Sequence, residues 1–161
     1  MNIIEKNKTS MNLKKLETIS VKTTSKVPYI VKLKKYEGNP ILKPNHNKWE
    51  DRNVYNAAAT VYNGKVYLLY RAEGYDELRE GLKWECPITR LGLAISENGF
   101  DINYRSPQAV FDRDKKDPWR EYGCEDPRIS KIGDTYYIVF VSMSRFGYTG
   151  DRLGLATTKD F

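Results

Sequence analysis

A short charged segment, Glu125-Asp126-Pro127-Arg128, is the part of the sequence best suited to chemistry. Because a proline follows Asp126, we expect this aspartate to adopt an extended conformation. Alternate side chains of an extended chain share a face, so Asp126 and Arg128 would point one way and Glu125 the other. A carboxylate beside a guanidinium suits the binding of sugar hydroxyls or phosphate. A structural ion pair at the start of a strand explains the same pattern about equally well.

Two predicted β-hairpins would position this segment. The first has strands at Ala57–Tyr62 and Val66–Tyr70 around Asn63-Gly64, since Asn-Gly is a strong hairpin signal. Val66–Tyr70 is apolar throughout, which predicts a strand covered on both faces. The second hairpin turns at Gly133-Asp134 and leads into the apolar run Tyr136–Val141. Other expected elements are a strand at Val27–Leu33, strands at Arg90–Ser96 and Gln108–Phe111, and long loops at Tyr75–Thr89 and Asp112–Arg120.

An internal repeat links these elements. The sequence Arg-Leu-Gly-Leu-Ala occurs at 90–94 and again at 152–156, and the hairpin glycines Gly64 and Gly133 are spaced similarly. A repeat of three to four short strands is typical of β-propeller blades. The chain holds about two to two and a half such units, whereas a propeller closes with at least ~4 blades. The sequence therefore predicts an all-β, antiparallel, partial propeller that is a fragment or needs a second chain or a C-terminal half.

Composition and charge place the chain among soluble globular proteins. Of 161 residues, 30% are charged, 40% are hydrophobic and 12 are Tyr. Residues 1–35 hold nine Lys against Glu5 and Glu17, whereas the rest holds 18 basic and 19 acidic residues. We therefore expect a disordered basic arm at 1–27, with a short helix at Met11–Ile19, before a domain at 28–161. A neutral domain argues against nucleic-acid binding.

The remaining residue types exclude several kinds of site. Two Cys and a single His, His46, leave no basis for a disulfide scaffold, the usual zinc ligand sets or a Ser-His-Asp triad beside a nucleophile motif. We expect Cys124 to be a small buried core residue. No apolar run approaches the ~18 residues of a membrane span, and no secretory signal is recognisable at the N-terminus. These features predict a cytoplasmic protein without a metal or organic cofactor.

Five motifs that occur in order carry a resemblance to a known family. They are Asn39-Pro-Ile-Leu42, Val54-Tyr-Asn56, Tyr70-Arg-Ala-Glu73, Arg90-Leu-Gly-Leu-Ala94 and Gly123-Cys-Glu-Asp-Pro-Arg-Ile129. From about Tyr36 to Phe161 the chain resembles glycoside hydrolase family 130, the β-mannoside phosphorylases and related β-mannosidases. The resemblance implies roughly the first half of a five-bladed β-propeller.

The resemblance also implies an activity and site residues. The reaction is inverting cleavage of a β-mannoside by inorganic phosphate as co-substrate, giving α-mannose 1-phosphate. Asp126 would be the catalytic acid, acting through a mannose hydroxyl and lying next to Asn56 and Arg71, which would bind the sugar. Arg90, Glu125 and Arg128 are expected substrate-binding residues. The family's main phosphate-binding Arg and Lys residues would lie beyond Phe161.

Three functions remain open from the sequence. The chain is a mannoside phosphorylase or its N-terminal part, a β-mannosidase of the same fold, or a non-catalytic fragment that binds sugar weakly. Asn56 is as well explained as a turn residue, and Arg71 could form a surface pair with Glu73. A further tension is that Arg128 beside Asp126 should favour the ionised carboxylate, whereas a general acid has to be protonated.

Overall fold

The computed structural model describes residues 32–79 and 86–161. Contacts divide the chain into two compact parts, residues 1–34 and residues 35–161, and the second part contains every strand described below. The predicted basic arm at 1–27, the helix at 11–19 and most of the strand at 27–33 lie outside the described residues. Within the described part no helix is long and apolar enough to cross a membrane.

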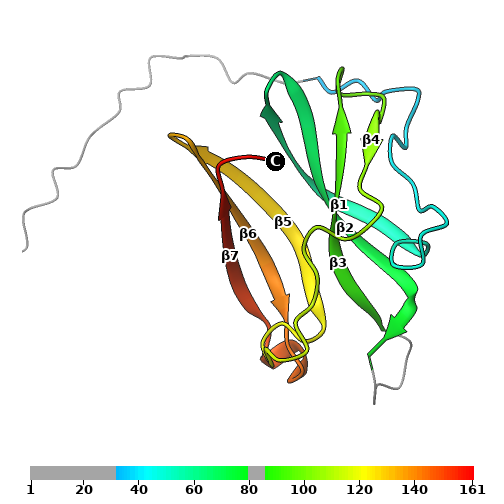
Figure 1. The fold of residues 1–161 in the computed structure, drawn as a ribbon. Helices are drawn as coiled ribbons and strands as arrows, with labels where there is room; N and C mark the ends of the chain where they lie inside the picture. Colours follow the sequence, from blue (N-terminus) through cyan, green and yellow to red (C-terminus); the bar gives the residue numbers. More distant parts are fainter. Residues whose placement is uncertain (1–31, 80–85) are drawn as a thin grey trace, which may run out of the picture. The chain divides into compact units, whose positions relative to one another are not determined.

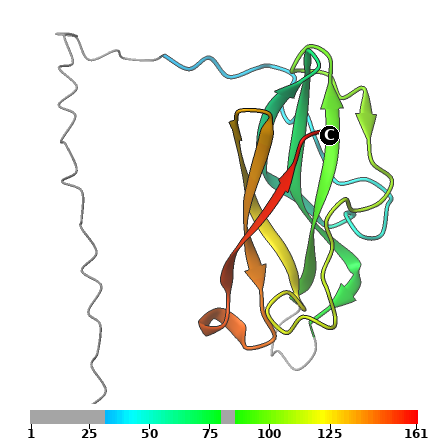
Figure 2. The same cartoon turned by 60° about the vertical axis from the view of Figure 1, so that its left-hand side comes forward.

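The described part of the chain is built almost entirely of strands, as predicted. Its elements fall into two groups that follow one another in the sequence (Figure 1). The first group is β1 (Asn53–Tyr62), β2 (Lys65–Leu78), β3 (Pro87–Ser96) and the short edge strand β4 (Tyr104–Arg105). The second group is β5 (Gly123–Ile132), β6 (Thr135–Met143), the 3₁₀ turn η1 (Gly147–Thr149) and β7 (Arg152–Thr158), with η1 visible between β6 and β7 in Figure 2.

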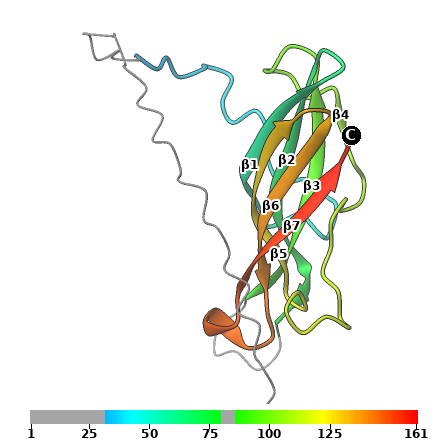
Figure 3. The same ribbon diagram turned by 90° about the vertical axis from the view of Figure 1, so that its left-hand side faces the viewer.

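Each group is a three-stranded antiparallel unit, and a single pairing joins the two. The hydrogen-bonded order is β1-β2-β3-β5-β6-β7, with β4 on β3. Between β3 and β5 the strands pair at one position only, Thr89 with Gly123. Gly123 has φ 108° and no room for a side chain, because a Cβ there would lie 1.8 Å from the Thr89 carbonyl oxygen. The two units run lengthwise beside each other in Figure 3, and β1 also contacts β5.

Both predicted hairpins are present, and both contain the same irregularity. The β1–β2 and β5–β6 hairpins turn at Asn63-Gly64 and Gly133-Asp134. Each first strand carries a register shift near its start, between Tyr55 and Ala58 in β1 and between Glu125 and Arg128 in β5. Such a bulge re-aims one side chain and often lies next to an active site. The two bulges place Asn56 and Asp126 at corresponding positions of the two units.

The strand boundaries correct several sequence predictions. Residues 75–78, expected in a loop, continue β2, and β3 begins at Pro87 rather than Arg90. Gln108–Phe111 was predicted to be a strand but contributes only an isolated bridge from Phe111 to Leu91. β4 was not predicted, because two residues are too short for a periodic pattern.

The internal repeat has a packing explanation. Tyr70 of β2 pairs with Gly92 of β3, and Phe140 of β6 pairs with Gly154 of β7. A Cβ on Gly92 would lie 2.2 Å from the Tyr70 ring, and one on Gly154 would lie 2.3 Å from the Phe140 ring. The glycine in each Leu-Gly-Leu motif thus leaves room for an aromatic ring from the neighbouring strand.

The core joins the two units, whereas β7 is exposed. Leu69, Leu91, Cys124 and Phe140 form one buried cluster from four strands, which confirms the prediction of a buried Cys124. Burial raises the pKa of the Cys124 thiol to about 12. Leu153 of β7 occupies the repeat position of Leu91, yet its exposed fraction is 77% against 1%.

A buried charge ties the segment before β1 to the first unit. Glu50 is fully buried, and its carboxylate accepts hydrogen bonds from Asn45 at 2.7 Å, Asn47 at 2.9 Å and the Tyr70 hydroxyl at 2.8 Å. The guanidinium of Arg105 pairs with the same carboxylate at 2.5 Å. A buried carboxylate needs such partners, so residues 45–50 are fixed against β2 and β4.

Candidate active site

Asn56 and Asp126 meet between the two three-stranded units. The Asn56 side-chain amide donates to Asp126 Oδ1 at 2.8 Å, across 70 residues of sequence. Both residues adopt left-handed backbone conformations, with φ of 48° and 50°. Asn and Asp tolerate this region better than other non-glycine residues. The paired bulges thus turn an amide and a carboxylate toward each other.

Arg71 of β2 is the central cation of the site. Its Nη1 lies 2.9 Å from Glu125 Oε2 and 3.3 Å from Asp126 Oδ1, and its Nη2 lies 2.8 Å from Glu73 Oε1. The guanidinium also stacks 4.7 Å from the centre of the Tyr55 ring. Its side chain is only 16% exposed, so Arg71 is not part of a plain surface pair. The positive charge is shared among three carboxylates.

Glu73 is a site residue that the sequence reasoning did not include. It is buried and accepts hydrogen bonds from the Tyr55 hydroxyl, from Asn53 Nδ2 at 2.8 Å and from Arg71. Burial opposes ionisation, but these donors and the charge of Arg71 together lower the pKa of Glu73. The signal was available, because Arg71 and Glu73 are two residues apart in one strand and share a face.

Glu125 and Arg79 extend the ionic network away from Asp126. Glu125 Oε1 lies 3.3 Å from Arg79 Nη2, and the two side chains are 12% and 11% exposed. Arg79 also donates to the Pro87 carbonyl and lies 5.4 Å from the centre of the Tyr122 ring. Burial raises the pKa of Glu125, against the opposing charges of Arg71 and Arg79. Glu125 is therefore held between two guanidinium groups.

The predicted arrangement of the Glu-Asp-Pro-Arg motif is wrong in its geometry. Asp126 is left-handed rather than extended, because the bulge requires it, and proline disfavours only the right-handed helical region for the residue before it. Asp126 and Glu125 consequently contact the same Arg71 instead of facing opposite ways. Arg128 is exposed and donates to the Pro127 carbonyl at 2.7 Å. The cation beside Asp126 is thus Arg71, and the ion pairs of the described residues include none from Arg128.

Arg90 belongs to a different cluster. Its side chain is 5% exposed, and its three guanidinium nitrogens pair with Asp112 at 3.0 Å, Asp76 at 3.0 Å and Glu77 at 2.6 Å. Burial opposes the positive charge of Arg90, but the three carboxylates together raise its pKa. The structure therefore brings Asn56, Arg71, Glu125 and Asp126 together, and places Arg90 and Arg128 in other contacts.

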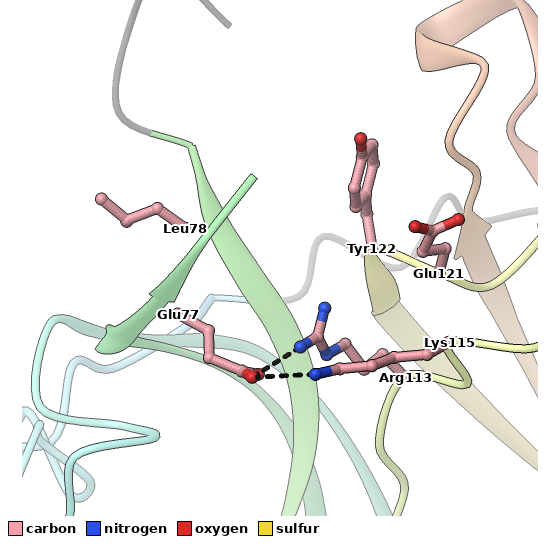
Figure 4. A pocket seen from close by; sticks show the side chains of 6 residues that line it. All are labelled: Glu77, Leu78, Arg113, Lys115, Glu121 and Tyr122. Carbon is pink, nitrogen blue, oxygen red and sulfur yellow. Dashed lines mark hydrogen bonds and ion pairs between the residues drawn. The ribbon is translucent and has the colours of Figure 1, made fainter. Parts of the chain in front are cut away.

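A polar cavity of 440 Å³ lies beside this second cluster. Glu77 and Leu78 reach it from β2, and its other lining residues come from the segment before β5: Arg113, Lys115, Glu121 and Tyr122 (Figure 4). Glu77 Oε1 pairs with Arg113 at 2.5 Å and with Lys115 at 3.7 Å. Tyr122 links the cavity to the Asp126 site, because its ring also contacts Arg79.

The site presents the Asp126 carboxyl group in a fixed orientation. The side chain of Asp126 is 36% exposed, so a substrate can reach it. Asn56 and Arg71 both donate to Oδ1. Donors on one carboxyl oxygen leave the other as the place for a proton. Among the described residues there is no group of His, Cys, Asp and Glu side chains arranged to hold a metal ion.

Comparison with known proteins points to one family. A family model described as beta-1,4-mannooligosaccharide phosphorylase (Glyco_hydro_130) matches residues 14–161, beginning earlier than the resemblance predicted from about Tyr36 onward. A 1,2-beta-oligomannan phosphorylase from Thermoanaerobacter sp. (strain X514) is 35% identical over 133 residues, which cover 81% of this chain and 43% of that relative. This chain therefore spans less than half the length of that relative.

Solved structures agree with this assignment. A glycosyl hydrolase from Bacteroides ovatus has a TM-score of 0.65 and 31% identity, covering 77% of this chain and 37% of its own. A structure reported for the GH130 family of mannoside phosphorylases, said to contain glycoside hydrolases that target beta-1,2 mannosidic linkages in Candida mannan, has a TM-score of 0.65 and 30% identity, with the same coverage. The family suggested by the five motifs is thus confirmed, and the chain belongs to glycoside hydrolase family 130.

Proposed function

We propose that this chain supplies the proton-donating part of an inverting glycoside phosphorylase that cleaves β-mannosides with inorganic phosphate. The observation that carries the proposal is the pair of hydrogen bonds from Asn56 and Arg71 to the same oxygen of Asp126. They fix the orientation of the carboxyl group and leave Oδ2 to carry the proton toward the substrate. Positioned acids of this kind contribute ~10²–10⁴-fold to a rate.

The reaction follows from the chemistry of inversion. As the bond from the anomeric carbon to the leaving oxygen breaks, that oxygen gains the proton of Asp126, passed on through a mannose hydroxyl. A phosphate oxygen forms the new bond from the opposite face, giving α-mannose 1-phosphate. Phosphate is already an anionic nucleophile, so no second carboxylate is required as a base. Cations must hold it in line, and we place those cations outside residues 1–161.

The fold proposed for the complete enzyme is a five-bladed β-propeller, in which β1–β3 and β5–β7 are two blades. Because the chain spans 43% of the oligomannan phosphorylase, we propose full activity for the chain together with the further blades that a second chain or a C-terminal half would provide. We take β-1,2-mannobiose as the first substrate to test, since that relative is described as acting on 1,2-linked mannan, and a β-1,4-linked dimer as the second.

Hydrolysis is the second candidate, because a similar solved structure is reported for a family said to contain β-1,2-mannosidic hydrolases. The two functions separate in one assay. The chain, together with the second chain or C-terminal half that provides the further blades, is incubated with mannobiose, with and without phosphate, and the products are followed by ³¹P NMR and sugar analysis. Phosphate-dependent α-mannose 1-phosphate supports phosphorolysis, whereas free mannose formed equally without phosphate supports hydrolysis.

The role of Asp126 is tested in the same assay with Asp126→Asn. We expect at least a ~100-fold loss of turnover, and near-normal turnover by the variant would refute the proposal. Sugar binding is followed separately by NMR of the Asn56 and Arg71 side chains. If the protein completed with its further blades binds mannobiose at these residues but never turns it over, it is a sugar-binding module rather than an enzyme.

A further inference from the structure

The guanidinium of Arg71 lies closer to two of its three neighbouring carboxylates than to the third. Glu73 and Glu125 lie 2.8 Å and 2.9 Å from guanidinium nitrogens, whereas Asp126 lies 3.3 Å away. Glu125 and Asp126 approach the same nitrogen, Nη1. Interaction between charges weakens with distance and is stronger where water is excluded. The contact with Asp126 is therefore the weakest of the three, and the two Glu residues compete with it.

Glu73 anchors one end of this arrangement. Three donors, from Asn53, Tyr55 and Arg71, surround its buried carboxylate. Because a buried carboxylate with this many donors stays ionised, Glu73 holds Nη2 of Arg71 on the side away from Asp126. Tyr55 reinforces the arrangement by stacking on the Arg71 guanidinium.

Arg79 acts at the other end, through Glu125. It neutralises part of the Glu125 charge from the side opposite Arg71, and the Pro87 carbonyl and the Tyr122 ring hold it in place. Without this cation, Glu125 would depend on Arg71 alone and would draw Nη1 more strongly. Glu73 and Arg79 thus affect the contact between Arg71 and Asp126 in opposite directions.

We propose that Glu73 and Arg79 are positioning residues that set, with opposite signs, how firmly Arg71 holds the ionised carboxylate of Asp126. The inference rests on the proposed function only in that Asp126 is the acid of the reaction. The groups facing Asp126 are Asn56 from β1, Arg71 from β2 and its neighbour Glu125, with Glu73, Tyr55 and Arg79 behind them. Among the described residues, neither Glu73 nor Arg79 forms a hydrogen bond or an ion pair with Asp126.

Two charge-removing variants test the proposal. Glu73→Gln keeps the shape of the side chain and one of its two acceptor oxygens, but removes the negative charge that competes with Asp126 for Arg71. Its alkaline limb in the pH dependence of kcat should move to lower pH by about one unit. Arg79→Met removes the cation behind Glu125, so the limb should move to higher pH by a similar amount. If the two residues had only a structural role, the variants would lower activity, but their alkaline limbs would not move in opposite directions.

Matched controls retain the charge or lie elsewhere. Arg79→Lys and Glu73→Asp should restore most of the normal profile, and Glu97→Gln, which disrupts the exposed pair with Lys65, should leave it unchanged. Circular dichroism shows whether each variant folds. If Glu73→Gln does not fold, the opposite pair Arg79→Met and Arg79→Lys still decides the sign.

A second measurement does not depend on turnover. Carboxyl ¹³C NMR of the chain labelled at Asp follows the titration of Asp126, assigned with Asp126→Asn. Shifts of opposite sign in Glu73→Gln and Arg79→Met support the proposal, even if no mannoside is cleaved, in which case only the proposed function fails. Shifts of the same sign, or none in either variant, would overturn it.

Discussion

Asn56 and Asp126 are joined by a hydrogen bond of 2.8 Å, and they occupy the same position in two consecutive three-stranded units. Both have positive φ at a bulge near the start of the first strand. The candidate acid and the amide that orients it are therefore corresponding residues of an internal repeat. One local backbone feature, used twice, builds the centre of the site.

Two substitutions at Asn56 distinguish the effect of backbone strain from that of the lost hydrogen bond. Asn56→Gly removes the amide donor but suits positive φ, whereas Asn56→Ala removes the donor and adds ~1–2 kcal/mol of strain. We expect both to lower mannoside turnover about tenfold or more, because a hydrogen bond to a charged group contributes ~1.5–3 kcal/mol. Both variants lose the stabilising hydrogen bond to Asp126, but the Ala variant should be the less stable of the two in urea unfolding, because it alone carries the strain. Equal stability of the two variants would contradict the strain argument.

The repeated glycines should not tolerate a methyl group. Gly92→Ala and Gly154→Ala each place a Cβ against an aromatic ring, and overpacking of this kind costs ~1–3 kcal/mol. Urea unfolding measures the loss. Combining Gly154→Ala with Phe140→Leu provides the control, since a smaller side chain makes room. If the double variant loses as much unfolding free energy as the two single variants combined, the Phe140 ring is not what excludes the methyl group.

The buried pair of Glu50 and Arg105 should be much more costly to break than an exposed pair. Arg105→Met leaves the fully buried Glu50 carboxylate without its cation, which destabilises a protein by ~3–5 kcal/mol. Lys65→Met, which breaks the exposed pair with Glu97, should cost less than ~1 kcal/mol. Similar losses in the two variants, measured by chemical unfolding, would show that Arg105 is not the partner on which Glu50 depends.

Glu73 should make folding stability depend on pH in the acidic range. Its pKa is lowered from the usual 4.5, so its stabilising contribution is present above pH 4.5 and is lost as pH falls through the folded-state pKa. In Glu73→Gln that contribution is absent at every pH. The difference in unfolding free energy between the parent chain and the variant should therefore shrink as pH falls from 6 toward 3. A difference that stays constant over this range would refute the assignment.

The two cysteines should differ in reactivity. Burial raises the pKa of Cys124 to about 12, so very little thiolate forms at pH 8, and the side chain has no exposed surface. Cys86 is partly exposed. We expect iodoacetamide to label Cys86 in the folded protein and Cys124 only after denaturation, as followed by mass spectrometry. Rapid labelling of Cys124 in the folded state would contradict its place in the core.

Local signals in the sequence were sufficient to predict much of the fold. Asn63-Gly64 and Gly133-Asp134 define hairpins by turn chemistry alone, and the Leu-Gly-Leu repeat reflects packing between neighbouring strands. The bulges were missed because the φ of Asn56 and Asp126 depends on pairing with β2 and β6. The alternation rule for an extended strand then placed Glu125 and Arg128 on the wrong sides.

In the site, too, residues within local motifs could be predicted, whereas contacts between distant segments could not. The motifs identified Asn56, Arg71 and Asp126, and the structure places these three side chains in contact. Arg79 carries no motif, and its partner Glu125 is 46 residues away in the sequence. Contacts of this kind depend on how the two units pack, which periodicity within one strand cannot predict.

The packing of the two units has a consequence for behaviour on heating. β3 and β5 pair only through Thr89 and Gly123, which form the hydrogen-bonded junction between the two three-stranded units. The Asn56 amide belongs to one of these units and the Asp126 carboxyl group to the other. We expect warming to loosen this junction, and so to separate the two groups, before the strands within each unit melt. Catalysis should therefore fail at a lower temperature than the circular dichroism signal of the strands.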